Sequence, residues 1–90
     1  MNFIHLSNTA VLDPRLLRAF AAIADANSFT LAADRLSMTQ STISQHIKQL
    51  EHELGCQLFM RVGKRVLLTE AGQLLRDHCE RILQDVKNAE

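Results

Sequence analysis

Side chains that could recognise nucleic-acid bases gather between residues 40 and 45. They carry hydroxyl or amide groups and no charge: Gln40, Ser41, Thr42, Ser44 and Gln45. A glutamine amide can form paired hydrogen bonds with adenine, and a serine or threonine hydroxyl can bond a base edge or contact a thymine methyl group. No carboxylate follows before Glu51, so this stretch would not repel a phosphate backbone. The chemistry that suits these residues is the reading of base edges in a DNA major groove.

Basic side chains follow this polar stretch and could neutralise phosphates. Lys48 lies three residues after Gln45, and Arg61, Lys64 and Arg65 come later in the chain. The whole chain is neutral, with ten basic and ten acidic residues, yet residues 35–69 hold five basic side chains against two acidic ones. This part of the sequence therefore has a net charge of +3 between two acidic flanks.

The sequence lacks the patterns that other kinds of chemistry need. Its four histidines and two cysteines show no metal-ligand spacing, its carboxylates form no acid–base pair, and no glycine-rich loop precedes a helix. We therefore expect no enzymatic activity, no metal and no cofactor. The sequence has few aromatic residues on which single-stranded bases could stack, because there is no tryptophan or tyrosine and there are only four phenylalanines.

Two helices are expected before the polar stretch. The first begins at Pro14, a residue that suits the first helical position, with Asp13 as its N-cap. The second is short and lies in residues 28–36, with Ser28 or Thr30 as its N-cap. Apolar residues recur at helical spacing in both segments, so each helix has a face to bury.

The polar residues themselves belong to a third helix, over about residues 39–54. Thr39 is the expected N-cap and Gly55 the natural stop. Apolar residues recur at steps of four, three and four, which is typical of one buried stripe: Ile43, Ile47, Leu50 and Leu54. On a helical wheel of about 100° per residue, Gln45 and Lys48 fall opposite this stripe. The helix should bury one face and present hydroxyls, amides and a cation on the other.

A hairpin and a long helix complete the predicted chain. Two β-tolerant runs on either side of the sequence VGKR predict a wing over residues 58–68, with Lys64 and Arg65 at its tip. Thr69 is expected to cap a helix over residues 70–90. Because a small domain cannot cover the whole apolar stripe of that helix, we predict that it pairs two protomers. The residues of this dimer seam are Leu75, Cys79, Ile82 and Val86.

These elements divide the chain into three parts. We expect residues 1–11 to form a mobile N-terminal arm, residues 12–69 a winged helix-turn-helix DNA-binding domain, and residues 70–90 a linker helix that dimerises. The fold class is mainly α, with a three-helix core, a two-stranded β wing and the long linker helix. No apolar run approaches the roughly 20 residues of a membrane span, and no secretory signal is visible. We therefore expect a cytoplasmic protein.

Several short stretches stand in an order and spacing that are typical of one protein family. They are RAF, SFTLAADRL, TQSTISQHIKQLEHELGCQLF, the arginine at position 61, and LTEAG. Over about Leu12 to Val86 the chain resembles the N-terminal domain of LysR-type bacterial transcription regulators. The resemblance implies sequence-specific binding of double-stranded DNA at interrupted inverted repeats, by homodimers or by tetramers of the full-length proteins. It also implies that the third helix enters the major groove, the wing follows the adjacent minor groove, and the fourth helix pairs the protomers.

The family's residue roles carry over onto matching positions of this sequence. By this resemblance the base-reading residues are Gln40, Ser41, Thr42, Ser44 and Gln45. The residues expected to contact phosphates, or to reach DNA from the wing, are Thr30, Lys48, Arg61, Lys64 and Arg65. The chain departs from the family at Ser41, where proline is common, and at Gln45, where arginine is common. These departures bear on the preferred bases and not on the docking.

Two further expectations concern the protein as a whole. Members of the family carry a large C-terminal domain that senses a small molecule, whereas this chain stops inside the linker helix, so an effector is expected only for that missing domain. The competing hypothesis is a helical oligomerisation module without a nucleic-acid partner. The final helix alone would support this alternative, but the outer face of the third helix, which lacks acidic residues, and the basic wing would then have no role.

Overall fold

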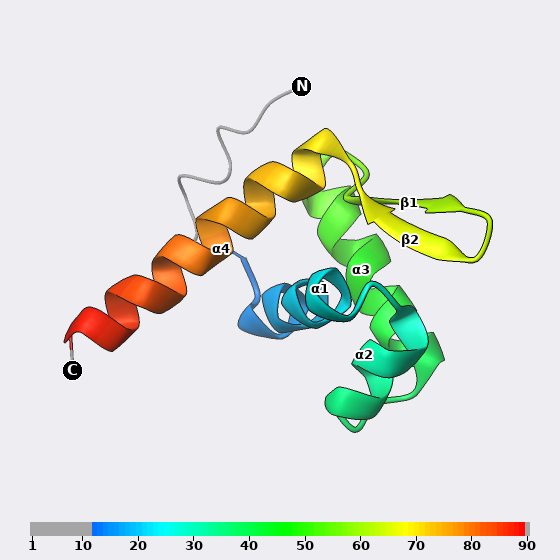
Figure 1. Ribbon diagram of the computed structural model, residues 1–90, viewed down its shortest axis with the longest axis horizontal. Coiled ribbons are helices and arrows are strands. Elements are labelled where there is room, and N and C mark those ends of the chain that lie inside the picture. Colours follow the sequence, from blue (N-terminus) through cyan, green and yellow to red (C-terminus); the bar gives the residue numbers. More distant parts are fainter. Residues whose placement is uncertain (1–11, 90) are drawn as a thin grey trace.

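The computed structural model describes residues 12–89, and it describes side chains as far as Arg81. Within that range the elements are α1 (Pro14–Ala26), α2 (Phe29–Arg35), α3 (Gln40–Leu54), β1 (Phe59–Val62), β2 (Arg65–Leu68) and α4 (Glu70–Ala89). The first three helices pack together, the hairpin of β1 and β2 extends beside α3, and α4 packs against α1 and continues beyond the packed helices (Figure 1). The predicted winged helix-turn-helix with a long last helix is confirmed. The predicted arm, residues 1–11, lies outside the described residues.

Capping groups fix the starts of the first two helices. The Asp13 carboxylate accepts a hydrogen bond of 2.9 Å from the backbone N–H of Arg15 at the start of α1. The Ser28 hydroxyl accepts one of 3.1 Å from the Leu31 N–H at the start of α2. Ser28, and not Thr30, is therefore the N-cap of the second helix, and the hydroxyl of Thr30 is available for other contacts.

The ends of α3 also follow the sequence prediction. The Thr39 hydroxyl accepts a hydrogen bond of 3.0 Å from the Thr42 N–H, which satisfies one of the free backbone donors of the first turn. At the other end, Gly55 has a φ of +72° and caps the helix in the left-handed region, which glycine enters without a steric penalty. These two residues define α3 as a helix of 15 residues.

The core lies where α1, α3 and the start of α4 meet. The predicted stripe of α3 is buried along its whole length: Ile43, Ile47, Leu50 and Leu54. The largest fully buried side chains elsewhere in the core are Leu16, Phe20, Ile23, Leu58 and Leu75. From α2 only Ala32 and Ala33 are buried, and their small side chains let this helix cross close to its neighbours. Burial of this stripe fixes which face of α3 remains open to solvent.

The turn of the hairpin is shorter than the sequence predicts. Val62 pairs with Arg65 as the last pair of an antiparallel ladder, so only Gly63 and Lys64 form the turn. Gly63 has a φ of +63°, as the first central position of a type II′ turn requires, and such two-residue turns match the twist of the flanking strands. The prediction that Arg65 lies at the tip was therefore wrong. Arg65 belongs to β2, and Lys64 alone carries a charge at the tip.

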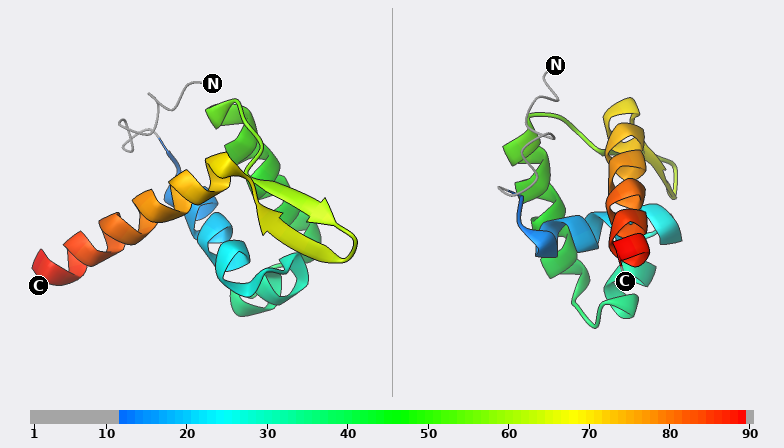
Figure 2. Two further views of the ribbon diagram at one scale, coloured as in Figure 1. Left: turned by 45° about the horizontal axis from the view of Figure 1, so that its top comes forward. Right: turned by 90° about the vertical axis from the view of Figure 1, so that its left-hand side faces the viewer.

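The first two turns of α4 are part of the core. Ala71 and Leu75 are buried against the rest of the chain. A Cβ atom on Gly72 would collide with the backbone oxygen of Leu58 and lie 2.8 Å from a methyl carbon of Leu68, so the helix sits directly on the base of the hairpin. The later turns of α4 extend away from the other helices in two different views (Figures 1 and 2). No helix in residues 12–89 is long and apolar enough to cross a membrane.

Candidate DNA-binding surface

The face of α3 opposite its buried stripe is open to solvent. Its exposed residues include Gln40, Ser41, Gln45, Lys48 and Gln49. No carboxylate precedes Glu51 on this helix, so the first three turns offer hydrogen-bonding groups and a cation without a negative charge. Among the predicted base-reading residues, Gln40, Ser41 and Gln45 thus share one surface with the predicted phosphate contact Lys48.

Thr42 and Ser44 are half-buried and lie at the flanks of this surface. The Thr42 hydroxyl accepts a hydrogen bond of 2.9 Å from the hydroxyl of the N-cap Thr39, so it is partly engaged within the protein. Ser44 faces the hairpin and lines a notch between α3 and β1. The structure therefore separates these two residues from the fully exposed ones, although the sequence pattern treats them alike.

Thr30 of α2 lies beside the start of α3. Its hydroxyl is 3.4 Å from the side-chain oxygen of Gln40, a long hydrogen bond that joins the two helices of the helix-turn-helix. Thr30 is exposed, and it therefore places a hydroxyl next to the first turn of α3. This position is compatible with its predicted contact to a DNA phosphate.

A notch of about 270 Å³ separates α3 from β1. It is lined by Phe29, Ser44, Ile47, Lys48, Glu51, Phe59 and Arg61. Two cations, Lys48 and Arg61, lie at this notch with a single carboxylate, Glu51. The Glu51 carboxylate accepts a hydrogen bond of 2.7 Å from the backbone N–H of Leu58. This carboxylate is therefore partly engaged in holding the start of the hairpin. The notch is therefore suited to an anion.

The predicted DNA-contacting cations have no acidic partner among the described side chains. They are Lys48, Arg61, Lys64 and Arg65, and all four are exposed. The ion pairs found in residues 12–81 are Arg15–Asp13, Arg35–Asp25 and Arg76–Glu80. Because no described carboxylate neutralises them, the cations of α3 and the hairpin are available to phosphates.

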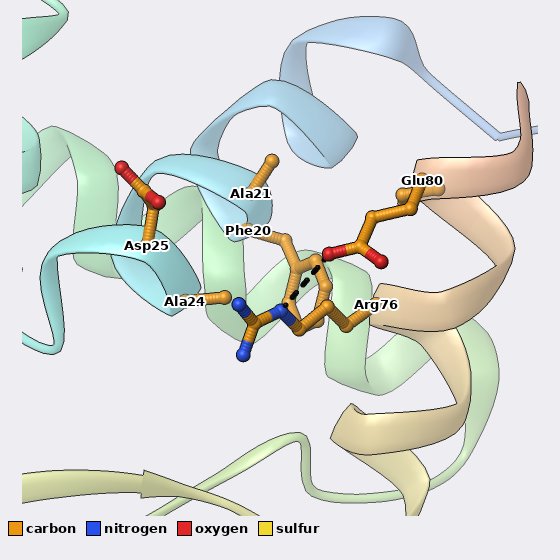
Figure 3. A pocket seen from close by; sticks show the side chains of 7 residues that line it. Phe20, Ala21, Ala24, Asp25, Arg76 and Glu80 are labelled. Atoms are coloured by element: carbon orange, nitrogen blue, oxygen red, sulfur yellow. Dashed lines mark ion pairs between the residues drawn. The ribbon is translucent and has the colours of Figure 1, made fainter. Parts of the chain in front are cut away.

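A second hollow, of about 250 Å³, lies between α1 and α4 (Figure 3). Phe20, Ala21 and Ala24 form its floor from α1, and the ion pair of Arg76 and Glu80, at 3.4 Å, faces them from α4. Cys79 also lines it. Asp25 lines it as well. Its charged side chains are already engaged in ion pairs, Asp25 with Arg35 and Arg76 with Glu80.

The predicted dimer seam is only partly described. Leu75 is fully buried within its own chain, where it belongs to the core. Cys79 is half-buried, whereas the side chains of Ile82 and Val86 lie outside the described residues. The seam therefore stays a prediction, and Leu75 has a structural role in the single chain whatever else it contacts.

The cysteines are held in their protonated form by their surroundings. Burial, followed by the neighbouring Glu80, raises the pKa of the Cys79 thiol. Burial and then the Glu51 carboxylate raise the pKa of Cys56 in the same way. Since the thiolate is the reactive form of cysteine, neither residue is prepared for catalysis. Among the described residues no group of three potential ligands could hold a metal ion.

Sequence reasoning missed two residues at the notch. Helical spacing indicates only that Phe29 lies on the apolar face of the second helix, yet its ring lies under the guanidinium of Arg61, with 4.9 Å between the Arg61 Cζ and the ring centroid. The sequence indicates only that Glu51 is the first carboxylate of α3, yet its side chain holds the start of the hairpin through the Leu58 N–H. Alternation along β1 could have placed Phe59 and Arg61 on one face, but no local signal indicates that this face meets Phe29.

Comparison with known proteins agrees with this geometry. Residues 14–73 match the family model described as "Bacterial regulatory helix-turn-helix protein, lysR family". The chain is 46% identical over 76 residues to the HTH-type transcriptional regulator XapR of Escherichia coli strain K12, covering 84% of this chain and 26% of that protein. It is 43% identical over 76 residues to the RuBisCO operon transcriptional regulator of Allochromatium vinosum, covering 84% of this chain and 25% of that protein.

Solved structures give the same result for the fold. A complex of the BenM DNA-binding domain with catB site 1 DNA superimposes with a TM-score of 0.79 at 36% identity, covering 87% of this chain and 88% of that one. A complex of the CbnR DNA-binding domain with DNA gives a TM-score of 0.77 at 32% identity, covering 87% and 90%. The chain spans about a quarter of the length of the two regulators named above. From the family match over residues 14–73, the chain belongs to the LysR family of bacterial helix-turn-helix regulators.

Proposed function

We propose that this domain binds specific sequences of double-stranded DNA and so serves bacterial transcription regulation. The observation that carries the proposal is the outer face of α3, which presents hydrogen-bonding groups without a carboxylate before Glu51, together with cations that have no described acidic partner. Two structural neighbours at 36% and 32% identity are complexes of DNA-binding domains with DNA, which supports the same reading. The function is binding, and it uses no catalytic step, metal or cofactor.

In this proposal α3 enters the major groove and its polar residues read base edges. Gln45 is the principal reader, because it is exposed one turn into the helix and its amide can bond both polar groups of an adenine. Gln40 and Ser41 are the exposed residues at the start of the helix, where base edges are approached first. Thr42 and Ser44 contribute from the flanks. Thr42 uses the hydrogen-bonding capacity that its bond to Thr39 leaves free, and Ser44 contributes from the notch.

The cations position the domain on the duplex. Lys48 and Arg61 face the backbone that passes between α3 and the hairpin, and the exposed Thr30 offers a hydroxyl to a phosphate at the other side. Lys64 at the tip and Arg65 in β2 extend the basic surface along the wing toward the adjacent minor groove, whose negative potential attracts such side chains. These contacts strengthen binding to every sequence, whereas the α3 residues discriminate among sequences.

We also propose that two chains pair through α4 and bind an inverted-repeat site. The later turns of α4 extend away from the packed helices (Figure 1), so they are placed to meet a second copy. In the longer proteins of this family the assembly would extend to tetramers, and a small-molecule effector would act through a further domain. The protein would work in the cytoplasm, where bacterial DNA is found.

The test is selection of bound duplexes from a random pool, followed by sequencing. The proposal expects an enriched motif with two-fold symmetry and a fixed spacing between its halves. The affinity for the selected site should exceed that for a scrambled duplex by at least about a thousandfold. A pool that remains random after repeated rounds, with no salt-dependent retention on duplex DNA, would contradict the proposal.

The competing function is a helical oligomerisation module without a nucleic-acid partner. Both functions predict that the chain pairs through α4 and that Ile82→Glu, which puts a charge in the predicted seam, produces monomers. Sedimentation of the two proteins is therefore combined with a measurement of duplex binding, which separates the two functions. If the chain oligomerises and binds no duplex at low salt, the oligomerisation module is the better account. If the wild-type chain selects a symmetric site and Ile82→Glu binds only a half-site weakly, the DNA-binding account holds.

A further inference from the structure

Three phenylalanine rings connect the buried core to a basic residue of the wing. Phe20 is fully buried, and its ring centroid lies 5.3 Å from that of Phe59 at the start of β1. The ring of Phe59 lies in turn 5.9 Å from Phe29, edge to face at 69°. The guanidinium of Arg61 rests over the Phe29 ring, 4.9 Å from its centroid. Arg61 is thus the exposed end of a packed series that starts in the core.

The hairpin presents this face toward the helices and not toward solvent. Phe59 and Arg61 are two residues apart on β1 and therefore lie on the same face of the strand. The residues between and after them, Met60 and Val62, lie on the other face and are 46% and 53% exposed. Contact of Phe59 and Arg61 with Phe29 therefore attaches β1 to the first residue of α2 and sets the direction of the wing.

Arg61 has a carboxylate within the same notch but does not pair with it. Glu51 lines the notch with Arg61, yet the ion pairs of the described side chains do not include these two residues. The Glu51 carboxylate instead accepts the Leu58 N–H at 2.7 Å. An arginine over an aromatic ring keeps its N–H groups free at the edge of the guanidinium plane, so Arg61 can still bond a phosphate.

We propose that Phe29 is a positioning residue for DNA binding, which holds the Arg61 guanidinium above the notch and presents it to a backbone phosphate beside Lys48. This inference rests on the proposed DNA-binding function and adds a residue that itself touches no base. Ring stacking favours the held position of an exposed arginine by about twofold to fivefold over free rotamers. Removing the ring should therefore weaken binding by the same factor, with any DNA sequence.

The test is a double-mutant cycle between Phe29→Leu and Arg61→Ala, with Phe29→Tyr as the matched control that keeps the ring. Affinities are measured for the selected duplex and for a scrambled one, over a series of salt concentrations. Arg61→Ala should reduce the slope of log affinity against log salt by about 0.9, as expected for one lost phosphate contact. Phe29→Leu should weaken binding to both duplexes about twofold to fivefold, and Phe29→Tyr should bind like the wild type.

The decisive comparison is the effect of Phe29→Leu in a protein that already lacks Arg61. If Phe29 acts through Arg61, then Phe29→Leu costs no further affinity in the Arg61→Ala background. The same twofold to fivefold loss in both backgrounds would overturn the inference, because it would show that the ring supports the fold alone. Equal binding of Phe29→Leu and wild type would overturn it as well.

A measurement on the unmutated protein covers the case in which Phe29→Leu does not fold. A guanidinium over an aromatic ring is shielded by the ring current, so the Arg61 side-chain proton resonances should be shifted upfield in the free protein. Unshifted resonances would overturn the inference. Wild-type protein that binds no duplex would contradict the proposed function, whereas wild-type binding with independent effects of the two substitutions contradicts this inference alone.

Discussion

Thr69→Val should destabilise the domain, because its hydroxyl joins the start of α4 to the segment before the hairpin. The Thr69 hydroxyl donates a hydrogen bond of 2.6 Å to the backbone oxygen of Gln57 and accepts one of 3.0 Å from the Gly72 N–H. It thereby caps α4 and ties the start of that helix to Gln57, two residues before β1. Valine has nearly the same shape and β-branching as threonine, so this substitution removes the two hydrogen bonds and little else.

The magnitude follows from the two bonds. Loss of an N-cap costs about 0.5–2 kcal/mol, and loss of a second hydrogen bond about 0.5–1.5 kcal/mol. Both bonds are near the surface, where water can replace them in part, so we expect a total of about 1–3 kcal/mol. For a domain of this size, a loss of about 2 kcal/mol lowers the melting temperature by about 8–16 °C.

Urea unfolding followed by circular dichroism measures this loss, and Thr69→Ser provides the control. Serine keeps the hydroxyl and therefore both hydrogen bonds, and we expect it to retain most of the wild-type free energy of unfolding. Thr69→Val that unfolds within about 0.5 kcal/mol of the wild type, the range of an ordinary surface substitution, would refute the role given to this hydroxyl.

Three other predictions address the helices and the titrating groups. Gly72→Ala should lower the free energy of unfolding by about 1–3 kcal/mol, because the new methyl group would collide with the Leu58 backbone oxygen. Urea unfolding measures this loss, and the control Gln73→Ala should change the free energy of unfolding less. A Gly72→Ala variant more stable than the wild type would contradict this packing. Because burial raises the pKa of Cys79, its alkylation at about pH 8 should be slower in the folded protein than in urea, and equal rates would count against its burial. The hydrogen bonds from Arg15 hold the pKa of Asp13 below its ordinary value of 3.8. The Asp13 carboxylate therefore stabilises the folded state fully above pH 3.8, and this stabilisation is lost as the pH falls through the pKa of the folded protein. Asp13→Asn should accordingly lose less thermal stability than the wild type between about pH 5 and pH 3, and parallel losses would be evidence against this linkage.

The parts of the fold that depend on local signals were predictable from the sequence. Thr39 and Gly55 define the ends of α3 through backbone capping, which a short stretch of sequence reveals. The stripe that starts at Ile43 fixes the buried face of the helix, and so it also fixes the open face that carries Gln45 and Lys48. The position of the candidate surface on α3 therefore follows from the same periodicity.

Features that depend on contacts between distant segments were not predictable in the same way. The sequence around Gly63 suggests a four-residue loop, and only the pairing of Val62 with Arg65 makes it a two-residue turn. The contact of Arg61 with Phe29 joins residues 32 positions apart, and nothing near either residue indicates it. Leu75 has the spacing of a dimer stripe, but the same spacing also suits a helix that packs on its own core.

The central claim is that the open face of α3 reads bases while neighbouring cations hold the backbone. It is tested most directly by titrating Gln45→Ala and Lys48→Ala against the selected duplex and a panel of its single-base variants. Both residues are exposed, so neither substitution should disturb the core.

We expect Gln45→Ala to cost about 1–3 kcal/mol on the selected duplex and to relax the preference at one base pair. We expect Lys48→Ala to weaken binding to every duplex in the panel by a similar factor and to flatten the salt dependence by about one unit. A Gln45→Ala variant that keeps the full base preference of the wild type would contradict the claim that Gln45 is the principal reader.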